Sequence, residues 1–117
     1  MTLFCKLCAT EEGFFKFGTV PNRDNNPLDL RHSPHAHHEA GSPDGIGEID
    51  TVADGWADAE RQAQLWASRG LTLAQAIHTL APPNENDTDG YLEFVIVGFG
   101  GRVDANTPMS QVLEIQA

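Results

Sequence analysis

The sequence predicts a mainly helical α+β domain with a small β-hairpin, and three observations support that class. Apolar residues recur at helical spacing in several segments separated by Gly and Pro. The run IGEID, residues 46–50, alternates apolar and polar residues as a half-buried strand does. The stretch from residue 14 to about residue 45 is rich in Pro, Asn, Asp, His and Gly, and a loop of that length is typically functional.

The first predicted helix covers residues 2 to about 12. Its apolar residues recur at helical spacing: Leu3, Phe4, Leu7 and Cys8. Thr2 suits the N-cap, and Gly13 suits the left-handed residue that ends a helix. Glu11 and Glu12 therefore lie in the last helical turn.

The segment that follows, to about residue 45, is predicted to be mostly irregular. Within it, Leu28 and Leu30 alternate with polar residues as residues 46–50 do. We therefore expect these two segments to pair as a small hairpin.

A second helix is predicted from Thr51, whose spacing to Asp54 resembles a capping box, to Gly70. Its apolar residues form one stripe: Val52, Trp56, Ala59, Ala63 and Trp66. Both tryptophans are expected in the core.

Three shorter helices complete the prediction. The first begins after Thr72, buries Leu73, Ile77 and Leu80, and ends at Pro82 and Pro83. The next is capped by Asp87 or Thr88, and its apolar residues are Tyr91, Leu92, Val95 and Ile96. The last is capped by Asn106 or Thr107, has Pro108 at its first position, and runs through Val112 and Leu113.

Length and charge limit the possible functions. The chain has 117 residues, which predicts one domain over residues 1–117, and its net charge is −10. Residues 41–117 carry −9 of that charge. So acidic a chain argues against partners that are nucleic acids or anionic membranes, and leaves a polysaccharide open. We expect a monomer.

The N-terminus does not read as a signal peptide, and no apolar run approaches the length of a transmembrane helix. We therefore expect any export to use another route, such as host lysis or delivery inside a particle.

The cysteines and histidines raise the possibility of a metal. Cys5 and Cys8 form a C-x-x-C pair, and His32, His35, His37 and His38 cluster in the loop. The alternative is that both cysteines are small apolar residues on a buried helix face. Adjacent histidines point in different directions, so we expect no metal and no cofactor.

Glu12 is the first candidate for chemistry. A general acid that works near neutral pH needs a raised pKa. The negative end of the helix dipole, the charge of Glu11 and an apolar wall made by Phe14, Phe15 and Phe17 are each expected to raise it. These arguments do not choose between Glu11 and Glu12.

Two long segments carry a resemblance. TEEGFFKFGTVPNRDNNPLDLRHSP, residues 10–34, resembles the opening of a phage-associated lysozyme-like family, in which a helix ending in Glu-Gly precedes an R-N-N-N-P-G-N-L-R motif. DGWADAERQAQLWASRGLTLAQAIHTLAPPNENDTDGYLEFV, residues 54–95, resembles its later segments. The likeness covers about residues 5–95. Three motif positions differ, because Asp24, Leu28 and Asp29 replace Asn, Gly and Asn. The loss of the Gly requires an ordinary backbone conformation at residue 28.

The resemblance implies a lysozyme-like fold that hydrolyses the glycan strands of peptidoglycan, with Glu12 as the general acid. A glycosidase usually needs a second carboxylate. Asp50 and Asp29 are equal candidates for it, ahead of Asp24 and Glu48. The expected substrate-binding residues are Asn25, Asn26, Arg31, His32, Thr51 and Tyr91, although Tyr91 also suits the core.

Three other readings remain open. A lytic transglycosylase would use the same Glu12 without a second carboxylate. A non-catalytic virion or wall-binding module would keep the fold without activity. A small zinc domain would use Cys5, Cys8 and the histidine loop.

Overall fold

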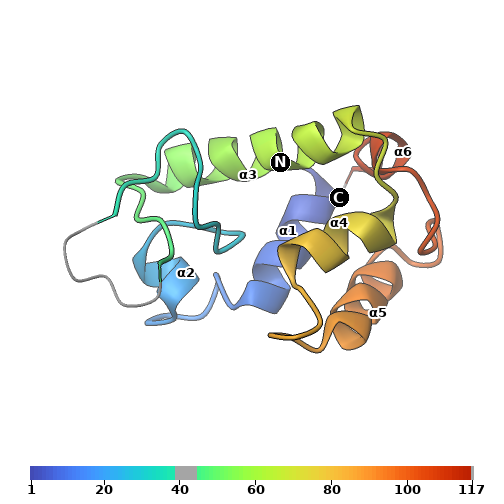
Figure 1. Cartoon of the computed structure of the whole chain (residues 1–117), viewed down its shortest axis with the longest axis horizontal. Helices are drawn as coiled ribbons and strands as arrows, with labels where there is room; N and C mark the ends of the chain where they lie inside the picture. Colours follow the sequence, from blue (N-terminus) through green and yellow to red (C-terminus); the bar gives the residue numbers. More distant parts are fainter. Residues whose placement is uncertain (39–44, 117) are drawn as a thin grey trace.

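The structure, a computed structural model, describes residues 1–38 and 45–116, and residues 39–44 of the predicted irregular segment lie outside it. Its helices are α1 (Leu3–Glu12), α2 (Val20–Arg23), α3 (Val52–Ser68), α4 (Leu73–Leu80), α5 (Thr88–Gly98) and α6 (Met109–Val112), as Figure 1 shows. Within this part of the chain, no helix combines the length and the apolar character needed to cross a membrane.

The predicted lysozyme-like α+β class with a β-hairpin is wrong, because the regular secondary structure of the described residues is helical apart from isolated bridges, and it contains no sheet. Residues 28–30 and 46–50 meet through one backbone bond, from Gly47 N to the Leu30 carbonyl at 3.0 Å. The described residues contain two isolated antiparallel bridges, of which one joins His37 to Glu48 and the other joins Thr72 to Pro108. The reason is local: Asp29 has a φ of 55°, which turns the chain in the middle of the expected strand.

The predicted helix ends are mostly confirmed. The Thr2, Thr51 and Thr72 side chains each accept a hydrogen bond from the backbone N–H three residues later, as N-caps do. Gly13 ends α1 with a φ of 85°. Asp87, rather than Thr88, caps α5 by accepting from Gly90 N at 3.1 Å.

Two short helices were not predicted correctly. The sequence assigned residues 20–23 to irregular structure, but Thr19 caps the four-residue α2 by accepting from Asn22 N. The expected cap of α6 at Asn106 or Thr107 is wrong. Pro108 stands at the N-cap, and no side chain caps α6. The existence of α6 was predicted and only its cap is wrong, whereas the four-residue α2 offers too little apolar periodicity to be detected.

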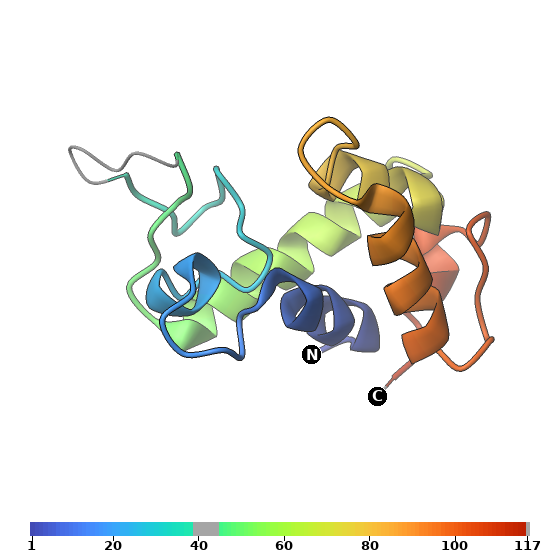
Figure 2. The ribbon, with the colours of Figure 1, turned by 90° about the horizontal axis from the view of Figure 1, so that it is seen from below.

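Helix α3 runs along the length of the molecule, and most of the other elements lie to one side of it (Figure 1). Figure 2 shows α2 and the segments around residues 30 and 50 at one end of α3, with α4, α5 and α6 at the other and α1 between them. Helix α1 packs against α5 and α3, α4 packs against α5 and α6, and α3 packs against α6. Glu12 and Gly13 therefore lie where the two groups of elements meet.

The core lies around these helix contacts. Phe4, Cys5 and Cys8 are fully buried, so the reading of both cysteines as small apolar residues is confirmed. Trp66 is buried at 2% exposure, whereas Trp56 is only partly buried. At the start of α3, Gly55 lies against Asn25, and a Cβ added there would be 1.9 Å from the Asn25 carbonyl oxygen. That contact holds the loop after α2 directly on α3.

Candidate functional site

Glu12 is the last residue of α1, and the chain turns away directly after it. The N–H of Gly13 bonds to the carbonyls of Ala9 and Thr10, which closes the helix end. The Thr19 hydroxyl then donates to the Gly13 carbonyl at 2.7 Å and holds the following turn in place. Glu12 is half-buried and Glu11 is exposed, so the structure separates the two residues that the sequence could not.

The pKa of Glu12 is raised to about 7. Burial of the carboxyl group is the largest cause, and the charges of Asp29 and Glu11 raise the pKa further. A hydrogen bond with Tyr91 acts in the opposite direction. The predicted wall of three phenylalanines is wrong, because Phe17 is 96% exposed and Phe15 is 57% exposed.

Tyr91 lies on α5 beside Glu12, inside the core. Its ring is 5% exposed, and its hydroxyl donates to the Cys8 carbonyl at 3.3 Å. A ring covered in this way offers no face on which a sugar could stack. Tyr91 instead links the end of α1 to α5 and contacts the Glu12 carboxyl.

A groove begins at Glu12. A pocket of about 230 Å³ is lined by the polar side chains of Glu12, Asp29, Arg31, Glu85 and Asn86, and by Leu28, Ile46 and Leu80. A second pocket, of about 300 Å³, shares Asp29, Arg31, Leu80 and Glu85 with the first and extends along α3 to Arg69. We call these two joined pockets the groove. Its two walls are the loop around residues 28–31 and the end of α4 with the turn after it.

Asp29 is the predicted second carboxylate that lies in the groove with Glu12. Its side chain lines both pockets, and its Oδ1 atom is buried. Its charge is close enough to raise the Glu12 pKa. Leu28, which replaces the motif Gly, is fully buried and avoids the left-handed region, as the sequence required.

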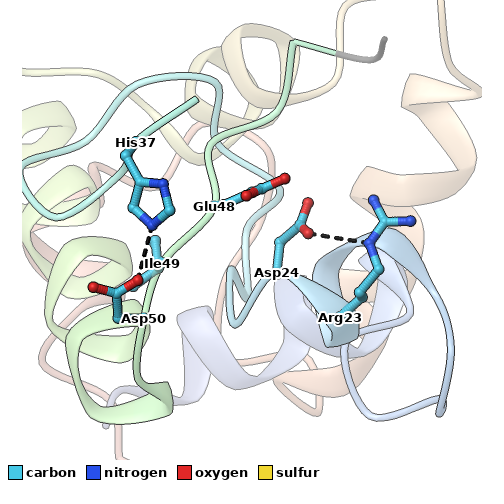
Figure 3. A pocket seen from close by; sticks show the side chains of 6 residues that line it. All are labelled: Arg23, Asp24, His37, Glu48, Ile49 and Asp50. Carbon is cyan, nitrogen blue, oxygen red and sulfur yellow. Dashed lines mark hydrogen bonds and ion pairs between the residues drawn. The ribbon is translucent and has the colours of Figure 1, made fainter. Parts of the chain in front are cut away.

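The other candidates for the second carboxylate lie elsewhere. Asp24, Glu48 and Asp50 line a separate pocket of about 330 Å³ with Arg23 and His37, and it shares no lining residue with the groove (Figure 3). Asp50 has 83% of its side chain exposed and bonds to His37 Nε2 at 2.8 Å. Asp24 pairs with Arg23 at 3.2 Å. The geometry therefore separates Asp29 from Asp50, which the sequence ranked equally.

Of the expected binding residues, Arg31 lines the groove. The Asn26 amide is 1% exposed and bonds to the backbone of Leu30 and Gly47, and the Asn25 amide donates to the Ile49 carbonyl at 2.9 Å. The two remaining residues, Thr51 and His32, do not line the groove. Thr51 caps α3, and the exposed His32 ring lies 5.3 Å from the His38 ring, centroid to centroid. These four residues shape or border the loop and do not line the groove.

Sequence reasoning missed several groove residues. Glu85 and Asn86 line the pocket beside Glu12, although the sequence gave their turn a structural role first. Gln62 and Arg69 of α3 line the far pocket. The Asn-Glu-Asn turn belongs to the family resemblance and offered a usable signal, whereas the polar face of α3 offered none.

The histidine loop is fixed to α3 because Ser33 and His35 both bond to Asp58, and we call this set of contacts the Asp58 clamp. Asp58, at 2% exposure, accepts hydrogen bonds from the Ser33 hydroxyl at 2.6 Å and from the His35 N–H at 2.9 Å, and it bonds to His35 Nδ1 at 2.6 Å. Burial alone would raise the pKa of Asp58, but these hydrogen bonds outweigh it and hold the pKa below its usual value. Asp58 in turn raises the pKa of His35, and Asp54 adds to this effect.

The residues suggested for zinc do not assemble into a site within the part of the chain that the structure covers. No three His, Cys, Asp or Glu side chains there are arranged to hold a metal ion. Burial raises the pKa of both cysteine thiols, which keeps them protonated and poor ligands.

The candidate site is therefore the groove with the two carboxyl groups of Glu12 and Asp29. Comparisons with protein-family models, with curated proteins and with solved structures find no match to this chain.

Proposed function

We propose that the chain cleaves the glycan strands of peptidoglycan, with Glu12 as the general acid. The single observation that carries the proposal is a carboxyl group with a pKa of about 7 at one end of a groove. At neutral pH about half of such groups hold a proton, which they can give to a leaving oxygen. The motif resemblance of residues 10–34 supports the choice of peptidoglycan.

Asp29 is assigned the second role in this proposal. Two carboxyl groups in different surroundings divide the acid and base tasks between them. Glu12 is half-buried with a raised pKa and serves as the acid. Asp29, charged and next to Arg31 in the lining, would activate a water or stabilise the positive charge that develops on the sugar.

The test compares two variants of neighbouring residues. Glu12→Gln removes the proton donor while keeping the shape of the side chain, and Glu11→Gln makes the same change on the exposed neighbour. We expect Glu12→Gln to lose clearing of purified cell walls by at least about a hundredfold, and Glu11→Gln to retain it. Thermal melts confirm that both variants are folded. Wall clearing by Glu12→Gln at the wild-type rate would rule the assignment out.

Two further readings are resolved by the same experiment. Mass spectrometry of the released fragments distinguishes hydrolysis from transglycosylation, because only transglycosylation leaves anhydro-sugars. Asp29→Asn adds a second criterion, since a transglycosylase needs no second carboxylate and would keep its activity. Binding to walls without any released fragments from the wild-type chain would identify a non-catalytic module.

A further inference from the structure

The groove is polarised by charge along its length. At the Glu12 end, the acidic side chains of Glu12, Asp29 and Glu85 line the pocket with Arg31 as its single basic residue. At the α3 end, Arg69 joins the lining and the Glu12 carboxylate is absent, so acidic and basic groups balance. The pocket at Arg69 therefore repels a negatively charged group less than the pocket at Glu12 does.

Arg69 is one of the few basic residues in a strongly acidic chain, and it lines the groove. The protein has 7 basic residues against 17 acidic ones, and two of the basic residues line this groove. Arg69 is exposed, and its guanidinium has no hydrogen bond or ion pair among residues 1–38 and 45–116. Such a side chain keeps its full capacity for bidentate hydrogen bonds to a carboxylate.

The neighbours of Arg69 suit a sugar that carries an acidic substituent. The Gln62 amide offers donors and an acceptor for hydroxyl and acetamido groups. The Thr79 hydroxyl donates to the Gln75 carbonyl at 2.8 Å and therefore offers an acceptor. Trp66 and Leu80 supply the apolar part of the same lining. A chain of neutral sugars would need only these groups and would gain nothing from a free cation.

We infer that the second pocket of the groove, which contains Arg69, binds a carboxylate carried by the glycan substrate. The inference rests on the proposed function, because peptidoglycan differs from a plain N-acetylglucosamine polymer in carrying acid on alternate sugars. Two sources share this chemistry: the lactyl carboxylate of a muramyl sugar without its peptide, and a carboxylate of the attached stem peptide. Arg69 is thus a specificity residue, remote from the bond that is cut.

The experiment measures binding by calorimetry in the Glu12→Gln background, so that no ligand is consumed. Three tetrasaccharides are compared: chitotetraose, an alternating glucosaminyl–muramyl tetramer with free lactyl groups, and the same tetramer with stem peptides. We expect Arg69→Gln to weaken binding of at least one carboxylate-bearing tetramer about tenfold and to leave chitotetraose unchanged. Whichever tetramer is affected identifies the source.

Two controls sharpen the result. Arg61→Gln removes a charge from an exposed position of the same helix that lines neither pocket, and should change nothing. Arg69→Lys keeps the charge without the bidentate geometry and should restore part of the affinity. Equal weakening of all three ligands by Arg69→Gln, no weakening of any, or no binding of a carboxylate-bearing tetramer by the parent protein would overturn the inference.

Failure of this inference and failure of the proposed function are distinguishable. If wild-type protein clears walls and Arg69→Gln binds as its parent does, the hydrolase stands and the carboxylate site falls. If Arg69-dependent binding is measured but wall fragments are never released, the site stands and the hydrolase falls.

Discussion

Asn26 gives the sharpest test of how the groove wall is built. Its amide is 1% exposed, donates to the Leu30 carbonyl at 2.8 Å and the Gly47 carbonyl at 2.9 Å, and accepts from Leu30 N at 3.0 Å. Asn26→Ala removes all three bonds. The Leu30 carbonyl keeps a bond from Gly47 N at 3.0 Å, so two backbone groups lose the partner that Asn26 provided. At roughly 1–3 kcal/mol for each stranded group, with partial relief by water, the expected loss is about 3 kcal/mol.

Urea unfolding of Asn26→Ala beside Asn84→Ala measures this loss. Asn84 lies exposed in the turn after α4, so its variant should stay within about 0.5 kcal/mol of wild type. For a chain of this size, 3 kcal/mol corresponds to a melting point lower by about 12 °C. A stability change for Asn26→Ala no larger than that for Asn84→Ala would refute the reasoning, and would return Asn26 to the list of substrate contacts.

Three further outcomes follow from the titrating groups. Because the Glu12 pKa is raised to about 7 from an ordinary value near 4.5, the folded state holds a proton that the unfolded state has lost between these pH values, so stability falls as pH rises through them. Glu12→Gln should therefore melt higher than wild type at pH 8 but not at pH 4, and a higher wild-type melt at pH 8 would contradict this. Tyr91→Phe removes a hydrogen bond that lowers the Glu12 pKa, so the Glu12 carboxyl resonance should titrate at higher pH in the variant; an unchanged midpoint would argue against the contact. Because Asp58 raises the His35 pKa, the stability that the pair contributes is complete below pH 6.5 and is lost as pH rises through the folded-state pKa. NMR should show the His35 midpoint returning toward 6.5 in Asp58→Asn, and its failure to move would count against the clamp.

The helices were predictable from sequence because each carries its own local information. Thr51 and Thr72 are N-caps that begin helices, and Gly13 ends a helix, through hydrogen bonds that span three or four residues. The same locality explains why Glu12 was placed in the last helical turn, since Gly13 follows it. The burial that separates Glu12 from Glu11 depends on tertiary packing and was not predictable from the sequence. The four-residue α2 was too short for this information to accumulate, whereas α6 was predicted from the Pro at its start.

The hairpin was mispredicted because an alternation of apolar and polar residues indicates a strand but does not show which segment pairs with it. Residues 28–30 alternate correctly, yet Asp29 adopts a left-handed conformation that Asp tolerates better than most residues. The neighbouring Asn26 amide then takes up carbonyls that a strand partner would otherwise pair with. The sequence ranked Asp29 and Asp50 equally, because Asp29 is close to Glu12 in the chain and Asp50 ends the expected strand. Only the folded structure separates them, since Asp29 lines the pocket with Glu12 and Asp50 lines another.

Helix α3 has a mechanical consequence for the groove. Its 17 residues form a rod of about 25 Å, which is bonded to the loop beside one wall and is linked to α4 of the other wall through α6. Asp58 fastens the loop wall to it through Ser33 and His35, and α3 packs on α6 at the other end. The distance between the walls therefore depends on the straightness of α3, on the hydrogen bonds of Asp58, and on the packing of α6 against α3 and α4. A ligand meets an opening of preset width, which lowers the entropy cost of binding and limits the thickness of polymer that can enter.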